Sequence, residues 1–504
     1  MPVTRALAAA LALLLVAAMP ARATTPPTLT VIDTINPGSD GSYAMDISDS
    51  VAFKGYLYFM GYNDTYGEEL WRTNGTSTTL VKDIIVDAGN SSPEYFAALG
   101  DYLYFRAHAD GIGQELWRTD GTEAGTTLVK DINAGSGGAD SSYPAHFVQL
   151  GGYLYFSATQ DTNGSELWRT DGTAAGTTLV KDIRSGVGES SSPTYLTVAG
   201  DYIYFAAVDT ANGTELWRTD GTEAGTTLVK DIASGADGSG PYGLIEFGNY
   251  VYFTAHDGTS GYELWRTDGT EAGTTLVKDI RSGAGSSDPS DFALLGDYLY
   301  FSAHDGTSGY ELWRTDGTEA GTTLVKDIRS GADSGSPDYL TLFGDNLYFR
   351  ANDGTTGYEL WRTDGTEAGT TLVESNVSDP DSSSYPENLT PLGDYLYFKA
   401  NDSTHDSEIW RTDGTTTQRV PFPVDGQYIS CDCYDTNVIA VGGRLYTTVY
   451  SETIGNEFAY LDEPTYVLPE TNRDESVWTT ALVILAGLTA AAGAALRRRG
   501  AVRT

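Results

Sequence analysis

This chain is poor in cysteine, methionine and basic residues. Its 504 residues include 2 Cys and 4 Met, and 30 Lys plus Arg stand against 69 Asp plus Glu. The two cysteines, Cys431 and Cys433, cannot build a disulfide framework, and a zinc site needs four ligands. They form either a local disulfide or an incidental pair, and we expect a fold that does not depend on them.

The shortage of basic residues gives a formal net charge of −39. The stretch 24–476 alone carries −45, because six arginines and no acids lie in the two ends of the chain. Such a surface repels phosphate backbones, so nucleic acid is excluded as a partner. It suits cations, a salty medium or simple solubility.

Apolar residues with a helical period are also missing between the two ends of the chain. The 58 glycines and 33 tyrosines favour short strands that are joined by tight turns. Composition therefore predicts an all-β fold.

The two ends are predicted to be targeting segments. Residues 1–23 combine Arg5, an apolar run and an Ala-Arg-Ala site, which predicts a signal peptide that is cleaved after Ala23. Residues 477–496 are apolar or small and long enough to span a bilayer, and the basic tail 497–504 should stay on the cytoplasmic side. We expect an exported protein that is displayed on the cell surface.

A short linker, 468–476, precedes this apolar stretch. It begins with Leu468, Pro469, Glu470 and Thr471, and the order LPxT, apolar span, arginines resembles the sorting signal that sortases cleave in Gram-positive bacteria. Asn472 stands where that motif has Gly. The alternative is an uncleaved membrane anchor, and both predict surface attachment.

Internal repetition dominates the body, 24–467. The run ELWRTDGTEAGTTLVKDI occurs unchanged at Glu115, Glu215, Glu263 and Glu311. The repeated tryptophans are 46 to 51 residues apart, and a ninth, degenerate copy has Ala459 in place of Trp. Nine units therefore fill the body and leave no room for a second domain.

Each unit divides into four short runs that are rich in β-branched and aromatic residues, such as 289–296, 297–305, 310–317 and 322–328. Four strands every 48 residues predict a single large β-propeller of eight or nine four-stranded blades. An open β-solenoid is the alternative. Either residues 28–35 or residues 466–468 could supply the strand that completes the last blade.

The signature Glu-Leu-Trp-x-x-Asp-Gly-Thr, as in 311–318, resembles the ELWxxDGT-repeat family of exported bacterial proteins. Six copies match it fully, and the resemblance covers almost the whole mature chain. The resemblance implies export and surface display. It implies no known activity.

Catalytic motifs are scarce. No GxSxG, HExxH or phosphate-binding loop occurs. The histidines His108, His256 and His304 share one repeat position that holds Val208 in another unit, so we interpret them as turn residues. Arg314 and its equivalents are expected to pair with neighbouring carboxylates. Paired carboxylates for glycoside hydrolysis stay open, because acids are abundant.

Calcium is the one candidate cofactor. Hard cations take oxygen ligands, and acids at both ends of a Gly-rich turn offer two of them. The alternative is an ordinary hairpin whose Asp accepts turn amides. The candidate ligands are Asp257, Glu263, Asp305, Glu311, Asp353 and Glu359.

These observations favour a non-enzymatic role. We expect an adhesin or ligand-binding scaffold whose partner is an extracellular polymer, glycan or protein, and which contacts the membrane through its C-terminal helix. The alternatives are an extracellular propeller-type hydrolase or lyase, and a structural component of the cell envelope. Carboxylates that differ between blades would favour the enzyme.

Overall fold

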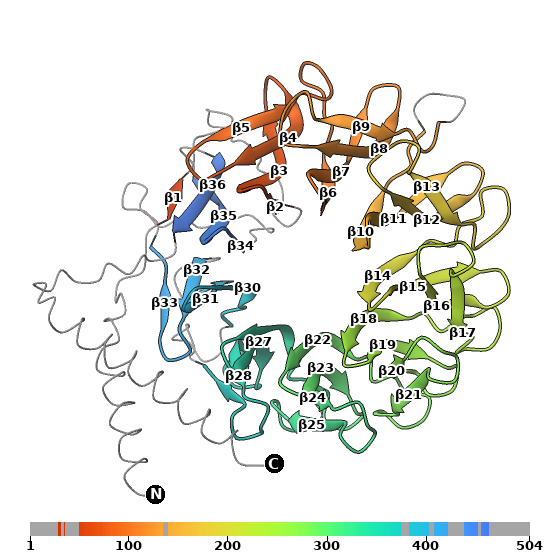
Figure 1. Cartoon of the computed structure of the whole chain (residues 1–504). Coiled ribbons are helices and arrows are strands. Elements are labelled where there is room, and N and C mark those ends of the chain that lie inside the picture. Colours follow the sequence, from red (N-terminus) through yellow and green to blue (C-terminus); the bar gives the residue numbers. More distant parts are fainter. Residues whose placement is uncertain are drawn as a thin grey trace, which may run out of the picture. The chain divides into compact units, whose positions relative to one another are not determined.

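The fold is a ring of nine four-stranded antiparallel sheets (Figure 1). The computed structural model describes residues 29–31, 35, 50–134, 140–373, 383–402, 408–421, 438–451 and 455–462. Every regular element in these ranges is a strand. The predicted all-β propeller is thus confirmed, with nine blades.

Each blade runs from an innermost strand to an outermost strand (Figure 1). The innermost strands are β2 (Val51–Phe53), β6 (Glu94–Leu99), β10 (Ala145–Leu150), β14 (Thr194–Ala199), β18 (Tyr242–Phe247), β22 (Ser290–Leu295), β26 (Asp338–Phe343), β30 (Glu387–Leu392) and β34 (Val438–Val441). The second strands are β3 (Tyr56–Asn63), β7 (Tyr102–Ala109), β11 (Tyr153–Gln160), β15 (Tyr202–Asp209), β19 (Tyr250–His256), β23 (Tyr298–His304), β27 (Asn346–Asn352), β31 (Tyr395–Ala400) and β35 (Arg444–Ser451).

The third and outermost strands contain the repeated eighteen-residue run. The third strands are β4 (Gly67–Thr73), β8 (Gly113–Thr119), β12 (Gly164–Thr170), β16 (Gly213–Thr219), β20 (Tyr262–Thr267), β24 (Tyr310–Thr315), β28 (Tyr358–Thr363), β32 (Glu408–Thr412) and β36 (Gly455–Asp462). The outermost strands are β5 (Thr78–Lys82), β9 (Thr127–Lys130), β13 (Thr178–Lys181), β17 (Thr227–Lys230), β21 (Thr275–Lys278), β25 (Thr323–Lys326), β29 (Thr371–Leu372), β33 (Thr417–Arg419) and β1 (Thr30–Val31).

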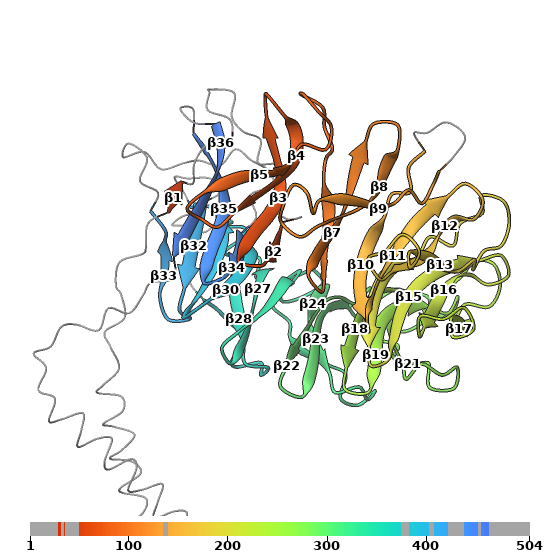
Figure 2. The same ribbon diagram turned by 45° about the horizontal axis from the view of Figure 1, so that its top comes forward.

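The two ends of the repeat region meet in the ninth blade, whose strand order is β1-β36-β35-β34 (Figure 2). Thr30 pairs with Tyr460 and Val31 with Ala459. Of the two candidate closing segments, the N-terminal one therefore completes the ring. The degenerate ninth repeat forms a blade like the others.

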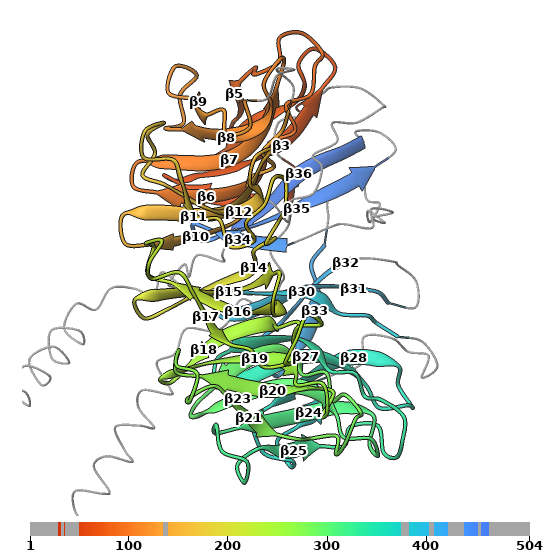
Figure 3. The same cartoon turned by 90° about the vertical axis from the view of Figure 1, so that its right-hand side faces the viewer.

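Burial between blades explains why the strands alternate as they do. Tyr300 and Leu312 belong to the core shared with the next blade, which contributes Phe349 and Trp361. Phe301 and Trp313, one residue further along, belong to the core shared with the previous blade. Because successive side chains of a strand point to opposite faces, each sheet is buried on both sides. Figure 3 shows neighbouring sheets lying face to face.

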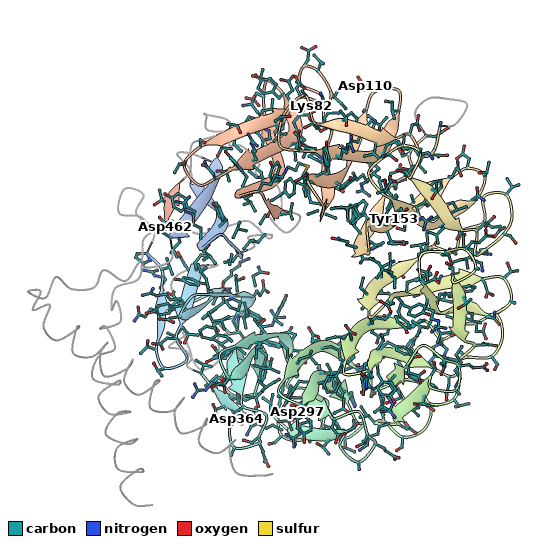
Figure 4. The ribbon with its side chains drawn as sticks, in the orientation of Figure 1. Lys82, Asp110, Tyr153, Asp297, Asp364 and Asp462 are labelled. Atoms are coloured by element: carbon teal, nitrogen blue, oxygen red, sulfur yellow. The ribbon has the colours of Figure 1, made fainter. Side chains whose placement is uncertain are left out.

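A polar contact accompanies the apolar interface between neighbouring blades, which we call the seam. The guanidinium of Arg314 lies over the ring of Tyr298 at 4.4 Å and donates to the carbonyl oxygen of Gly365 in the next blade at 2.8 Å. Arg169 repeats this arrangement over Tyr153. Figure 4 labels Tyr153 in its blade. The prediction that these arginines pair with carboxylates is therefore wrong. Their charge-assisted hydrogen bonds join one blade to the next.

The repeated Thr-Asp-Gly-Thr turn explains other letters of the motif. The Asp316 Oδ1 atom accepts hydrogen bonds from the amide and hydroxyl of Thr318 at 2.8 and 2.7 Å. The carboxylate leaves no room for a Cβ atom at Gly321, which would lie 2.0 Å from Oδ1. The sequence repeats because the same contacts recur in blade after blade.

Several predicted segments lie outside the described residues: the signal peptide 1–23 with Ala23, the linker 468–476, the span 477–496, the tail 497–504, and Cys431 and Cys433. In the part of the chain that the structure describes, no helix is long and apolar enough to cross a membrane.

The seam predicts a strong position effect for Gly→Ala. At Gly365, φ is +93° and a Cβ atom would lie 2.2 Å from the Tyr300 hydroxyl, whereas at Gly296, φ is +58° and no atom lies within 4 Å. Gly365→Ala should destabilise the ring by about 3 kcal/mol and Gly296→Ala by about 1 kcal/mol. Chemical denaturation of both variants tests this, and equal costs would contradict the seam model.

Candidate functional site

The predicted calcium loops place their aspartates in ordinary turns. The Asp305 Oδ1 atom accepts hydrogen bonds from the amides of Thr307 at 2.8 Å and Ser308 at 2.7 Å. Asp257 and Asp353 accept the equivalent pairs of turn amides. These are the contacts of an Asx turn, which stabilises a hairpin loop without a metal.

The glutamates of the same loops are fully buried and lie in another environment. Glu311 accepts hydrogen bonds from the amides of Ile328 and Gly335, both at 2.7 Å. Glu263 accepts one from the Ser287 hydroxyl at 2.5 Å, and Glu359 accepts one from Ser384. Each glutamate therefore fixes the segment that leads to the next blade.

No group of three or more His, Cys, Asp or Glu side chains that could hold a metal ion occurs among the described residues. In each predicted pair, the aspartate and the glutamate accept hydrogen bonds from different groups of the protein. Calcium binding at these loops stays a prediction.

The innermost edge of the ring differs from blade to blade. Among the described residues, seven innermost strands (β6, β10, β14, β18, β22, β26 and β30) begin directly after a proline that lies between two residues with positive φ. The residues before the proline have φ of 43–55°, and they are Ser92, Tyr143, Ser192, Gly240, Asp288, Ser336 and Tyr385. The residues two positions after it have φ of 55–65°, and they are Tyr95, His146, Tyr195, Gly243, Asp291, Tyr339 and Asn388.

Non-glycine residues rarely adopt positive φ, and each costs on the order of 1 kcal/mol. The strand pairing shifts by one residue at the same place, for example between Asp338 and Thr341. Such a bulge changes the direction of a side chain and is common beside active sites. The ring thus combines a constant, strained backbone with side chains that vary between blades.

Charged groups gather at this edge in two neighbouring blades. The guanidinium of Arg350 binds both carboxylate oxygens of Asp338, with Nε 2.9 Å from Oδ1, and its Nη1 donates to Glu387 Oε1 of the next blade at 2.9 Å. Both carboxylates retain contact with solvent, since their side chains are 28% and 34% exposed. We call Asp338, Arg350 and Glu387 the carboxylate pair with its arginine.

Tyrosines surround this group. Arg350 lies 4.8 Å from the ring centre of Tyr339 and 5.5 Å from that of Tyr358. Tyr358 stacks on Tyr385, with ring centres 5.6 Å apart and an interplanar angle of 23°. Tyr339 and Tyr385 are 41% and 47% exposed. Two accessible aromatic rings therefore flank two carboxylates.

Burial affects the ionisation of Asp338. Burial raises the pKa of Asp338 above its usual range, although its hydrogen bonds to Arg350 oppose this shift. A carboxyl group with a raised pKa holds its proton to a higher pH than a free aspartic acid does. The arrangement can therefore support acid–base chemistry.

A matched blade lacks the second carboxylate. Glu94 forms an ion pair with Arg106, which lies over Tyr95, at the positions equivalent to Asp338, Arg350 and Tyr339. The blade that follows Glu94 has Ala145 at the position that is equivalent to Glu387. Only one member of the pair is thus present there.

Sequence motifs do not predict this group. They lie in the eighteen-residue run and at the ends of the second strands, where the repeats are similar. The signal lay in the first run of each unit, which reads Asp-Tyr-Leu at 338, Glu-Asn-Leu at 387 and Tyr-Gly-Leu at 242. Aligning these runs would have found the variable edge.

Comparison with known proteins gives structural matches only. No protein-family profile and no curated protein sequence matches the chain. A puromycin hydrolase structure matches 70% of this chain and 58% of its own, at 16% identity and a TM-score of 0.36. Oligopeptidase B from Trypanosoma brucei matches 72% and 54%, at 11% identity and a TM-score of 0.39. A puromycin-hydrolyzing peptidase of Mycobacterium tuberculosis matches 73% and 60%, at 12% identity and a TM-score of 0.37.

The expectation of an adhesin or ligand-binding scaffold is corrected on this finding. The matched structures are named as puromycin hydrolase, prolyl endopeptidase, puromycin-hydrolyzing peptidase and oligopeptidase B, which are hydrolases, as in the alternative, and not adhesins. The chain spans 54–62% of the length of those proteins. At such low TM-scores, the case for a particular chemistry has to come from the residues of this chain.

The buried glutamates predict a pH-dependent stability. Burial raises the pKa of Glu69, Glu115, Glu263 and Glu311 from 4.5 to about 7, against hydrogen bonds that favour the charged form. The folded state therefore binds these protons more tightly than the unfolded state. The resulting stabilisation is complete below about pH 4.5 and is lost as the pH rises through 7.

Glu311→Gln should remove the contribution of one glutamate to this loss of stability at high pH. Between pH 5 and pH 8, its unfolding free energy should fall by roughly 1–3 kcal/mol less than that of the parent protein. The control is Glu319→Gln, at an exposed position of the adjoining turn. Urea unfolding at both pH values measures the difference, and three parallel pH profiles would refute the assignment.

Proposed function

We propose that this chain is an extracellular hydrolase whose reaction takes place at the carboxylate pair with its arginine. The supporting observation is that one arc of an otherwise repetitive ring places Asp338 and Glu387 on the same guanidinium. Constant structural contacts do not require such a difference between blades. Export and surface attachment, as the resemblance to the ELWxxDGT-repeat family implies, belong to the same proposal.

The proposed roles follow from the environments of the two groups. Asp338, whose pKa burial raises, delivers a proton to the leaving group. Glu387 takes a proton from the attacking water, so that the hydroxyl ends on one fragment and hydrogen on the other. Arg350 is a positioning residue, because it holds both carboxylates at the inner edge.

The test compares three single variants of the purified full-length protein. Hydrolysis is followed as reducing ends released from soluble glycans and as amines released from unfolded casein. Asp338→Asn and Glu387→Gln should each lower turnover by about 100-fold or more, since each removes a proton-transfer group. Glu94→Gln, which breaks the equivalent ion pair in the matched blade, should keep the parent rate.

Equal thermal unfolding midpoints would show that the variants are folded. No turnover of either substrate class, or turnover that survives both Asp338→Asn and Glu387→Gln, would overturn the proposed reaction. A loss of the same size in Glu94→Gln would assign the effect to the fold rather than to the carboxylates.

A further inference from the structure

The exposed aromatic side chains of the ring are concentrated at its strained inner edge. Among the residues that the structure describes, five tyrosines are at least 36% exposed, and all have positive φ and lie within two positions of a proline. They are Tyr95, Tyr143, Tyr195, Tyr339 and Tyr385. Two of the five, Tyr339 and Tyr385, flank the carboxylate pair with its arginine.

We infer that the substrate is a neutral polysaccharide, which binds across Tyr339 and Tyr385 beside Asp338 and Glu387. This inference rests on the proposed function and names its substrate class. We call Tyr339, Tyr358 and Tyr385 the tyrosine platform.

Ring geometry favours a sugar. Tyr385 presents one face while its other side stacks on Tyr358 at 23°, so the outer ring is held in a fixed orientation. An aromatic face carries partial negative charge and attracts the polarised C–H groups on the flat side of a pyranose. The two tyrosines lose little side-chain entropy on binding because packing already restricts them.

The polar groups fit the same substrate. The ionised carboxylate of Glu387 is an acceptor only, and sugar hydroxyls are donors that reach it without carrying charge. The oxygens of Asp338 and Glu387 remain partly exposed beside the platform. A glycan can therefore both stack and hydrogen-bond within one arc of the ring.

Charge excludes an acidic glycan. Arg350 is already bound by two carboxylates, and Asp291 of the preceding blade adds further negative charge near Asp338. The stretch 24–476 carries −45. A polyanion would meet repulsion both at the site and at long range.

The experiment measures binding with full-length protein that carries Asp338→Asn, so that a bound glycan is not consumed. Mobility is compared in native gels that contain dextran, laminarin, hydroxyethylcellulose, alginate or hyaluronan, with unfolded casein as a competitor. We expect retardation by at least one neutral glucan, no retardation by the two acidic polymers, and no competition by casein.

Single substitutions then locate the surface. Tyr385→Ala and Tyr339→Ala should each weaken binding by about three- to tenfold, whereas Tyr385→Phe should keep it, because the ring face remains. Tyr143→Ala is the matched control, since Tyr143 is 54% exposed at the position equivalent to Tyr385 but lies in a blade without the pair. It should bind within twofold of the parent.

The outcomes separate the two proposals. Hydrolysis of casein that depends on Asp338, with no retention by neutral glucans, would overturn the glycan inference and support the hydrolase. Tyr385-dependent retention by a neutral glucan that the parent protein never cleaves would support the glycan surface and overturn the hydrolase. Retention that is insensitive to both tyrosine→alanine changes would overturn the inferred surface.

Discussion

The contact between the two faces of adjoining blades is the constraint on which the whole ring depends. A four-stranded sheet of this composition is apolar on both sides, so no blade can bury itself alone. Tyr300 and Leu312 of one blade pack against Phe349 and Trp361 of the next, and the same pattern continues around the ring. Three further contacts support this interface: the stacked arginine, the glycine without a side chain and the buried glutamate. The eighteen-residue run is repeated because it encodes both sides of one interface.

Repetition made most of this architecture predictable. The four runs of each unit predict strands that the structure confirms, for instance β24 at Tyr310–Thr315, and the alternation of Leu312 with Trp313 predicts burial on both faces. The contacts of Arg314 were not predictable in the same way, because its acceptor is a main-chain carbonyl in the next blade. A search for oppositely charged side chains cannot find such a partner.

The carboxylate pair escaped prediction for a different physical reason. Asp338 and Glu387 are 49 positions apart, and only the lateral contact of β26 with β30 brings them to one guanidinium. These two residues differ from those at the equivalent positions of other repeats. A motif is defined by the residues that the repeats share, so it does not include them. The positive φ of Tyr339 and Asn388 is likewise invisible in the sequence, since neither residue type demands that conformation.

The closure of the ring through β1 has a consequence for how the chain reaches its native state. Val31 finds its partner Ala459 only after nearly the whole chain has become available, so the final joint has a far greater sequence separation than any joint between consecutive blades. Blades one to eight each consist of consecutive strands and can assemble in order from local contacts, whereas the ninth needs β1 from the other end of the repeat region. During synthesis the N-terminal strand is made first and pairs last. The chain is therefore expected to fold through an intermediate in which the ring is still open. Pairing of the two-residue strand β1 with β36 is then the last step of folding.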